Sequence, residues 1–404
     1  METDRKRRVL LITGKGGVGK TVVAAATALQ ASRLGRRTLV ISADPAHSLG
    51  DSFDMELEPE PKEVLPGLWA QESNVLYNTK KHWARIQRWL AAVFMEHQRG
   101  LERIEAEEVA ILLGFDELSS LIWIAEHYKS GAYDLIVVDC APTAETLRLL
   151  STPEVGQWWV RRWLRPLSKA SEAPAILRLG AEMVADFPLP TEEVVDDFYD
   201  LFTQIKEIQT LVSDPRITSV RLVLNPEKMV VRETQRAYTY FSFFGYTVDA
   251  IICNKVIPDD LEGDYWQDLI RTQRKYLKLI EESFSPLPIL KIPLLKEEVV
   301  GVEALGRLAE LLYDERDPAE PLIEESTFVV EEEKDSGDYL LKLKLPFVSR
   351  EDLKPIWKVK KEEELIVQVK NWKRNILLPL ELQGKEVVKA TLRDQWLTIR
   401  FRGR

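Results

Sequence analysis

Apolar and polar positions along most of the chain form two patterns, short apolar runs and longer helical stretches. The apolar runs that predict strands lie at residues 9–12, 38–44, 133–139, 219–225, 248–255 and 287–293. Helical patterns separate them, the first over residues 22–33. Strands that alternate with helices are typical of a parallel sheet covered on both faces. The pattern therefore predicts an α/β fold with a doubly wound, mostly parallel sheet.

Two long helical stretches interrupt this alternation. From Trp69 to Tyr128 the pattern becomes helical, and one apolar stripe is formed by Ile86, Trp89, Leu90, Val93 and Phe94. The second stretch carries three tryptophans on one stripe, Trp158, Trp159 and Trp163. We expect these stretches, about 65–130 and 151–213, to form a helical subdomain.

The pattern changes near the C-terminus. Residues 317–326 hold prolines among charges and predict a linker. Beyond it, apolar residues alternate with polar ones, as at Leu341, Leu343 and Leu345. Short alternating strands separated by turns predict an antiparallel β-sandwich. We therefore expect a first domain over 1–316 and a β-sandwich over 327–404.

The first predicted strand leads into a glycine-rich loop and then a helix. Residues 14–21, GKGGVGKT, match G-x-x-x-x-G-K-[S/T] in the strand–loop–helix context that this motif requires. Glycines let backbone N–H groups approach phosphate oxygens, Lys20 adds a positive charge, and the Thr21 hydroxyl can ligate Mg²⁺. The residues expected to bind nucleotide here are Gly14, Lys15, Gly16, Gly17, Val18, Gly19, Lys20, Thr21 and Val22.

An ordinary phosphate-binding loop does not require the extra lysine, Lys15. With it, the loop resembles the deviant Walker A motif of the family that contains the arsenite-pump ATPase, the tail-anchored-protein targeting ATPase, the nitrogenase iron protein and the septum-site ATPases. In that family the extra lysine reaches the nucleotide of the partner subunit. The resemblance therefore implies a homodimer in which Lys15 and Lys20 both act in catalysis.

Two further motifs fit this family. Residues 42–49, SADPAHSL, resemble its switch I, which implies that Asp44 positions or deprotonates the attacking water. Residues 133–139 predict a buried strand ending in Asp139, a Walker B pattern, so Asp139 is expected to hold Mg²⁺ directly or through water. The following switch II departs from the family pattern at three positions, Cys140, Ala144 and Glu145.

The last predicted strands carry the base-recognition elements that the resemblance implies. Residues 251–255, IICNK, resemble the family's adenine-recognition strand end, so Asn254 is expected to pair with the base, and Pro293 to line the nucleotide site. The helix predicted over 267–283 lacks the C-x-x-C with which the targeting ATPase binds zinc, so no zinc is expected. The β-sandwich resembles an α-crystallin (small heat-shock) domain.

The resemblance implies a function. We expect an Mg²⁺-dependent, homodimeric ATP hydrolase that uses ATP and ADP to control the binding or targeting of hydrophobic client proteins, tail-anchored or similar membrane segments, with transient membrane contact. The tryptophan stripe fits a client groove or an ordinary packed lid equally well. Two alternatives stay open: an arsenite- or anion-pump ATPase subunit, and a nucleotide-gated chaperone scaffold with vestigial hydrolysis.

Composition limits the partners and the cellular location that can be expected. The net charge is −10 and no block of Lys and Arg occurs, which argues against a nucleic-acid partner. The two cysteines, Cys140 and Cys253, lie in apolar runs and are expected to be core thiols, as in a reducing cytosol. Residues 1–8 are charged and lack the apolar core of a signal peptide. A cytoplasmic location is therefore expected.

Overall fold

The computed structural model of the protein describes residues 6–43, 48–72, 84–97, 115–140, 189–323, 325–334, 336–354, 357–359 and 364–402. Several predicted features lie outside these residues. They are Asp44, the switch II departures Ala144 and Glu145, and the tryptophan stripe of Trp158, Trp159 and Trp163.

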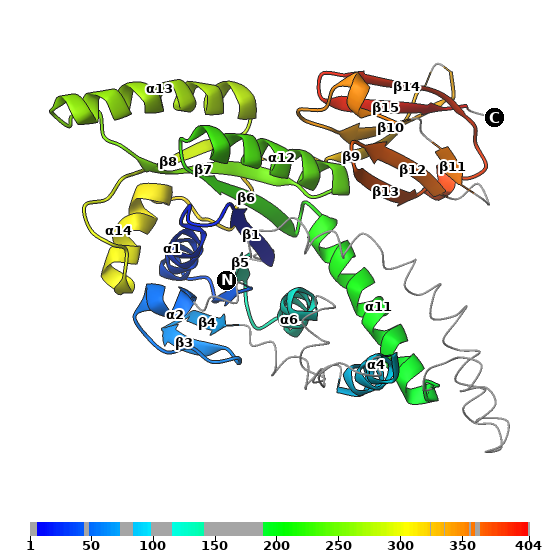
Figure 1. The fold of residues 1–404 in the computed structure, drawn as a ribbon, viewed down its shortest axis with the longest axis horizontal. Coiled ribbons are helices and arrows are strands. Elements are labelled where there is room, and N and C mark those ends of the chain that lie inside the picture. The colour runs from blue at the N-terminus through cyan, green and yellow to red at the C-terminus, as the bar shows by residue number, and fades with distance from the viewer. Residues whose placement is uncertain are drawn as a thin grey trace, which may run out of the picture.

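A large sheet forms the centre of the first domain (Figure 1). Among the described residues it has eight strands in the order β3-β4-β2-β5-β1-β6-β7-β8. Their bounds are β1 Arg8–Gly14, β2 Thr38–Ser42, β3 Lys62–Leu65, β4 Leu68–Glu72, β5 Leu135–Asp139, β6 Thr218–Leu224, β7 Val248–Val256 and β8 Ile289–Pro293. Neighbouring strands are parallel except β3 and β4, which pair antiparallel. The predicted doubly wound, mostly parallel sheet is confirmed.

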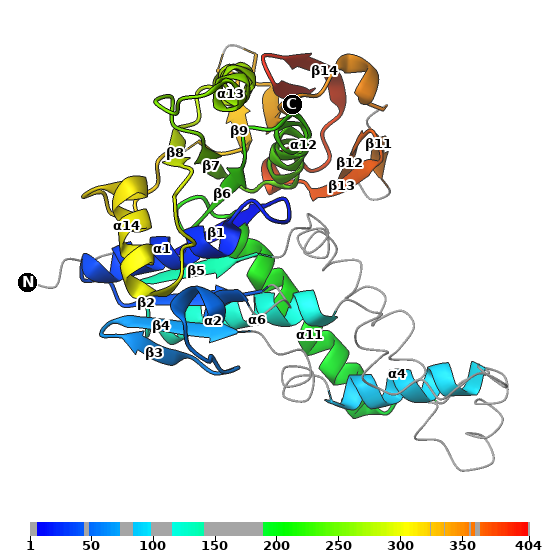
Figure 2. The ribbon, with the colours of Figure 1, turned by 60° about the vertical axis from the view of Figure 1, so that its left-hand side comes forward.

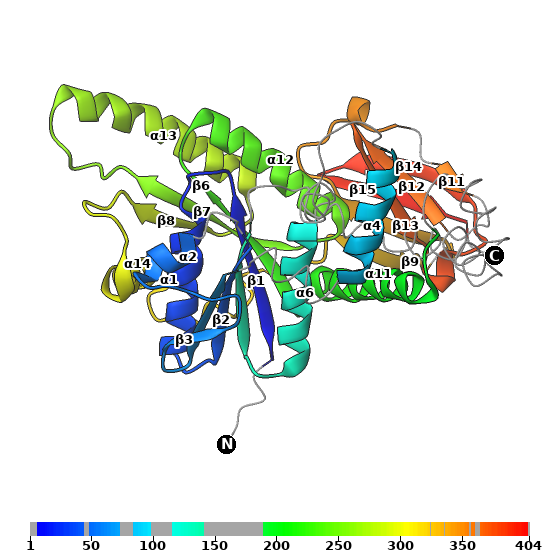
Figure 3. The same cartoon turned by 60° about the horizontal axis from the view of Figure 1, so that its bottom comes forward.

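The interior strands explain why the sequence shows apolar runs here. All residues of β2, β5 and β6 are buried, because helices cover both faces of the sheet. The helices α1, α2 and α14 lie on one side, and α6 and α11 on the other (Figure 3). The helix bounds are α1 Lys20–Arg33, α2 Ser48–Phe53, α4 Ala84–His97, α6 Phe115–Ser130, α11 Glu192–Ser213, α12 Lys228–Phe244, α13 Asp264–Phe284 and α14 Gly301–Tyr313. None of the helices described here is both long and apolar enough to span a bilayer.

Of the described helices in the predicted subdomain, α6 packs on the sheet, whereas α4 and the adjoining end of α11 extend away from it (Figure 2). The rings of Trp89 on α4 and Phe198 on α11 meet edge to face, with centroids 5.9 Å apart. Trp89 of the predicted stripe therefore packs on α11. The helical pattern predicted from Trp69 onward is wrong for its first residues, because Leu68–Glu72 form the strand β4 between β3 and β2. Four of those five residues are buried, but two of them, Gln71 and Glu72, are polar, so the sequence shows neither an apolar run nor an alternation that would mark the strand.

The C-terminal part is an antiparallel β-sandwich, as predicted. A four-stranded sheet in the order β14-β15-β10-β9 faces a three-stranded sheet, β11-β12-β13 (Figure 1). The bounds are β9 Phe328–Glu332, β10 Tyr339–Lys344, β11 Trp357–Val359, β12 Glu364–Val369, β13 Trp372–Leu377, β14 Val387–Arg393 and β15 Trp396–Phe401. The alternating Leu341, Leu343 and Leu345 are fully buried between the sheets, where they join Val367 and Ile399.

The helix α12 joins the two parts. Its last residues, Tyr238–Phe244, are all buried, whereas a surface helix has one polar face. One side of α12 lies on β6 and β7, and the strand β10 of the sandwich also contacts it (Figure 1). The sandwich is therefore held against the first domain through this helix.

Candidate nucleotide site

The glycine-rich loop connects the end of β1 with the start of α1. Gly17 and Gly19 have φ angles of 78° and 95°, a left-handed conformation that glycine adopts readily. A Cβ at Gly14 would overlap the carbonyl oxygen of Val223, and one at Gly19 would overlap the amide of Asn254. The loop therefore needs glycine for its backbone shape and for close packing. Gly19 caps α1, so the positive end of the helix dipole faces the loop.

The two loop lysines differ in their surroundings. Lys20, the first residue of α1, is 6% exposed. The Lys15 side chain is 38% exposed, and its Nζ lies 3.3 Å from Oε2 of Glu233 on α12. A buried lysine at a helix N-terminus suits a fixed phosphate contact. The exposed Lys15 is instead accessible to another molecule.

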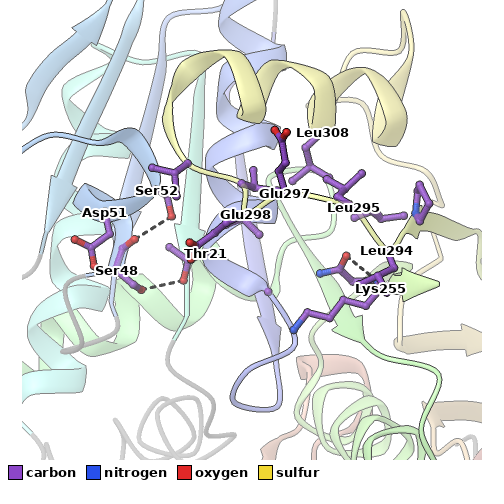
Figure 4. Close-up of a pocket in the computed structure, with 17 residues that line it drawn as sticks. Thr21, Ser48, Asp51, Ser52, Lys255, Leu294, Leu295, Glu297, Glu298 and Leu308 are labelled. Atoms are coloured by element: carbon purple, nitrogen blue, oxygen red, sulfur yellow. Dashed lines mark hydrogen bonds between the residues drawn. The ribbon is translucent and has the colours of Figure 1, made fainter. Parts of the chain in front are cut away.

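Oxygen atoms suited to Mg²⁺ lie beside the loop. The Thr21 hydroxyl is 3.1 Å from the hydroxyl of Ser48, the first residue of α2 (Figure 4). Asp139 ends β5 opposite Ile12 of β1, and its side chain is fully buried. Hydroxyl and carboxylate oxygens are the ligands that Mg²⁺ prefers, and it usually takes only one or two protein groups when phosphates and water complete its shell. Within the described ranges no group of three or more acidic, His or Cys residues could hold a metal ion. This set therefore fits Mg²⁺ bound together with nucleotide phosphates.

A cavity of about 430 Å³ opens next to the loop (Figure 4). Its walls come from the loop, α2, the end of β7 and the segment after β8. The predicted residues among them are Gly19, Thr21, Val22, Asn254 and Pro293. Most lining residues from the segment after β8 and from α14 are aliphatic, Leu294, Leu295, Val299, Val300 and Leu308, and Glu297 and Glu298 line the cavity as well. A cavity with an apolar wall beside a phosphate loop suits a nucleoside.

The end of β7 is tied to the loop. Asn254 donates from Nδ2 to the Val18 carbonyl at 2.8 Å, and its Oδ1 accepts from the Lys255 N–H at 2.8 Å. The ammonium of Lys255 donates to the Gly17 carbonyl at 3.1 Å. Asn254 thus supports the loop in addition to lining the cavity.

Sequence reasoning gave no role to several residues that contact this site. Ser48 and Lys255 lay inside recognised motifs, so their places could have been found from the motifs alone. Glu72 at the end of β4 accepts from the Gly50 N–H of α2 at 2.8 Å, and Glu233 pairs with Lys15. Neither glutamate belongs to a motif, and their contacts depend on tertiary packing.

The two cysteines are free, as predicted. Burial raises the pKa of Cys140 to about 12, with Asp139 adding to the effect and Lys20 opposing it. Burial also raises the pKa of Cys253 to about 12, partly opposed by Lys291. Cys140 follows β5 and Cys253 lies on β7, with β1 and β6 between them. Three strand spacings place them about 14 Å apart. The two thiols therefore do not form one site.

Comparison with known proteins places the chain in a family. Residues 7–314 match the family described as "Anion-transporting ATPase", and residues 336–401 match the "HSP20-like domain found in ArsA". A protein of Aquifex aeolicus named "Putative arsenical pump-driving ATPase 1" is 37% identical over 97% of this chain and 99% of its own length. A Prosthecochloris vibrioformis protein named "Putative arsenical pump-driving ATPase" is 38% identical over 98% and 96%.

A further relative covers about four fifths of the chain. The "ATPase ASNA1 homolog" of Dictyostelium discoideum is 30% identical over 79% of this chain and 94% of its own length. The chain therefore belongs to the anion-transporting ATPase family and is an ATPase of that family with a C-terminal HSP20-like domain.

Proposed function

We propose that the protein is an Mg²⁺-dependent ATP hydrolase that works as a homodimer and whose nucleotide state controls the binding of apolar helical segments of client proteins. The observation that supports this best is the glycine-rich loop with a buried Lys20 and an accessible Lys15 beside the cavity of about 430 Å³. A monomeric ATPase would need only Lys20.

The chemistry assigned to the chain follows from charge and position. The loop N–H groups and Lys20 bind the β- and γ-phosphates and neutralise the charge that develops during transfer. When bound, Mg²⁺ would be held by Thr21 and by Asp139, directly or through water, and would supply further charge neutralisation. Asp44, which lies outside the described residues, is assigned the role of positioning or deprotonating the attacking water. Asn254 and Pro293 line the base side of the cavity.

The surroundings of Lys15 are an argument for a dimer. Its ammonium contacts Glu233 of its own subunit, and its side chain keeps 38% of its surface exposed. A cation that a partner delivers to the transferring phosphoryl group is worth on the order of 10³–10⁵ in rate. Joining two subunits face to face would bring each Lys15 to the other's nucleotide, as the family resemblance implies.

The helical subdomain supports client binding. α4 and α11 form an amphipathic pair that carries Trp89, Phe198, Tyr199 and Phe202 around Val195, away from the main sheet (Figure 2). Apolar side chains on paired helices can hold an apolar helix of a partner. The resemblance to the targeting ATPase points to a membrane-protein segment as that partner, with transient membrane contact during delivery.

The test combines dimerisation and client binding. Sedimentation should detect a dimer with ATP and Mg²⁺, and fluorescence anisotropy should detect a labelled apolar helical peptide that binds only in one nucleotide state. Lys20→Ala serves as the control that cannot respond to ATP. Peptide binding of equal affinity with ATP, with ADP and without nucleotide would contradict nucleotide control, and a monomer under every condition would contradict the dimer.

The names of the relatives favour one alternative, an arsenical pump ATPase. Soft thiolates are the ligands such a metalloid site needs, and this chain offers only Cys140 and Cys253, about 14 Å apart by strand spacing with both thiol pKa values raised to about 12. Arsenite should therefore leave ATP hydrolysis unchanged. Stimulation by arsenite would revive this alternative.

A second alternative is a nucleotide-gated scaffold with vestigial hydrolysis, which the switch II departures at Cys140, Ala144 and Glu145 favour. Comparing the ATP turnover of the native chain with that of Asp44→Asn separates this scaffold from the proposed ATP hydrolase. Equal turnover in both would support the scaffold.

A further inference from the structure

One ion pair links the phosphate loop to a distant part of the chain. Lys15 and Glu233 lie 3.3 Å apart, and their side chains are 38% and 44% exposed. Glu233 is the one acidic residue within α12, Lys228–Phe244. The ammonium that is expected to act in the partner subunit is therefore engaged within its own subunit.

The helix that carries Glu233 is firmly held at its other end. Thr239, about 9 Å further along the axis, donates from Oγ1 to the Pro346 carbonyl at 2.7 Å. The rings of Tyr240 and Trp372 meet edge to face with centroids 5.5 Å apart. Arg374 of the sandwich donates to the carbonyl oxygen of Phe243. These contacts fix α12 between the sheet and the sandwich, so Glu233 is presented from a rigid element.

We propose that Glu233 is a positioning residue that retains Lys15 within its own subunit until the nucleotide of the partner competes for the ammonium. This inference rests on the proposed dimer. One ammonium cannot satisfy the Glu233 carboxylate and a phosphate of the partner in full, so dimer formation must break or weaken the pair. The sandwich also contacts α12 and helps to fix its position. The placement of Glu233, and with it the contact that retains Lys15, therefore depends partly on the sandwich.

The size of the effect of removing Glu233 follows from the solvent exposure of the Lys15–Glu233 pair. Exposed ion pairs contribute roughly 0.2–1 kcal/mol, which corresponds to about 1.4- to 5-fold in an equilibrium constant. Each homodimer contains two such pairs, so removing the Glu233 charge should tighten the ATP-dependent dimer by about 2- to 25-fold. The effect is moderate, so the retained lysine can still be released by ATP.

The experiment compares Glu233→Gln with Glu282→Gln in the full chain. Glu282 pairs with Lys278 at 3.7 Å on α13, with side chains 64% and 76% exposed, and provides the same charge change away from the loop. The first readout is the acetylation rate of Lys15 without nucleotide, with Lys255 of the same site as internal reference. We expect an increase of about 1.4- to 5-fold at Lys15 in Glu233→Gln only.

The second readout is the protein concentration at which half the chains are dimeric with ATP. It should fall by about 2- to 25-fold in Glu233→Gln, because both pairs of the dimer are removed. The substitution should have no effect in a Lys15→Ala background, a dependence that a merely structural role would not produce. Unchanged acetylation of Lys15, or an equal shift in the Lys15→Ala background, would overturn the role of Glu233 alone. A raised acetylation rate in a chain that stays monomeric with ATP would overturn the proposed function, and with it the release step.

Discussion

The buried pair Arg221–Asp249 should be one of the most sensitive points of the fold. Both side chains are fully buried, and Arg221 Nε lies 3.1 Å from Asp249 Oδ1. Burial lowers the pKa of Arg221, but the Asp249 carboxylate and Tyr313 more than offset this, so the pKa is raised and the guanidinium stays charged. Asp249→Asn keeps the shape and removes the compensating charge.

The magnitude follows from the lack of solvent. Breaking a buried ion pair by removing one partner costs about 3–5 kcal/mol, because the remaining charge is left uncompensated. With a urea dependence of about 1–3 kcal/mol per molar, the unfolding midpoint should fall by about 1 M or more. The linker should loosen as well, since Arg221 donates to the Pro318 carbonyl at 2.8 Å and the Leu322 N–H donates to Asp249 at 3.4 Å.

The assay is urea unfolding followed by circular dichroism, with limited proteolysis of the linker. Asp214→Asn is the matched control, because Asp214 also pairs with an arginine, Arg216, whose side chain is 81% exposed. The control should shift the midpoint very little. The double variant Arg221→Leu with Asp249→Leu should recover part of the loss, because no lone charge remains. If Asp249→Asn shifts the midpoint no more than Asp214→Asn does, the reasoning is wrong.

Three further outcomes are expected. Lys20→Ala should abolish ATP hydrolysis and leave the circular dichroism spectrum unchanged, and native-like turnover would exclude the phosphate assignment. Asn254→Ala should weaken ATP binding about 5- to 150-fold and reduce the preference for ATP over GTP, measured by titration calorimetry, because it removes both a base partner and the bond to Val18. Cys253, which is fully buried, should react with a thiol reagent at pH 8 only on unfolding, whereas Cys140 is partly exposed; rapid labelling of Cys253 in the native chain would contradict its burial. Since the pKa of both thiols rises from the ordinary 9.0 to about 12 on folding, the unfolding free energy should fall as pH increases from about 9 to 12.

The sequence predicted the elements whose signals are local. The loop of residues 14–21 was found because spacing and context fix its conformation, and the buried strands were found because both of their faces are apolar. The hairpin of β14 and β15 lacks such a local signal. Its turn uses Asp394 and Gln395 with φ angles of 49° and 66°, and without a glycine the sequence did not mark the reversal.

Contacts between distant segments could not be predicted in this way. Lys15 and Glu233 come together only because α12 packs beside the phosphate loop, and no spacing rule connects residues so far apart in the chain. The same holds for Arg221 and Asp249, which meet because β6 and β7 are neighbours in the sheet. Such pairs depend on the order of strands, which hydrophobic periodicity does not encode.

The central claim is that a site is completed by the partner's Lys15. The most direct measurement is ATP hydrolysis after mixing Lys15→Ala chains with Asp44→Asn chains, each inactive alone. In a heterodimer one site regains both groups, so equal mixing should restore about a quarter of the native activity. That result is predicted here. Heterodimers that are verified by mass spectrometry and remain inactive would contradict the claim, because Lys15 would then act within its own subunit or not at all.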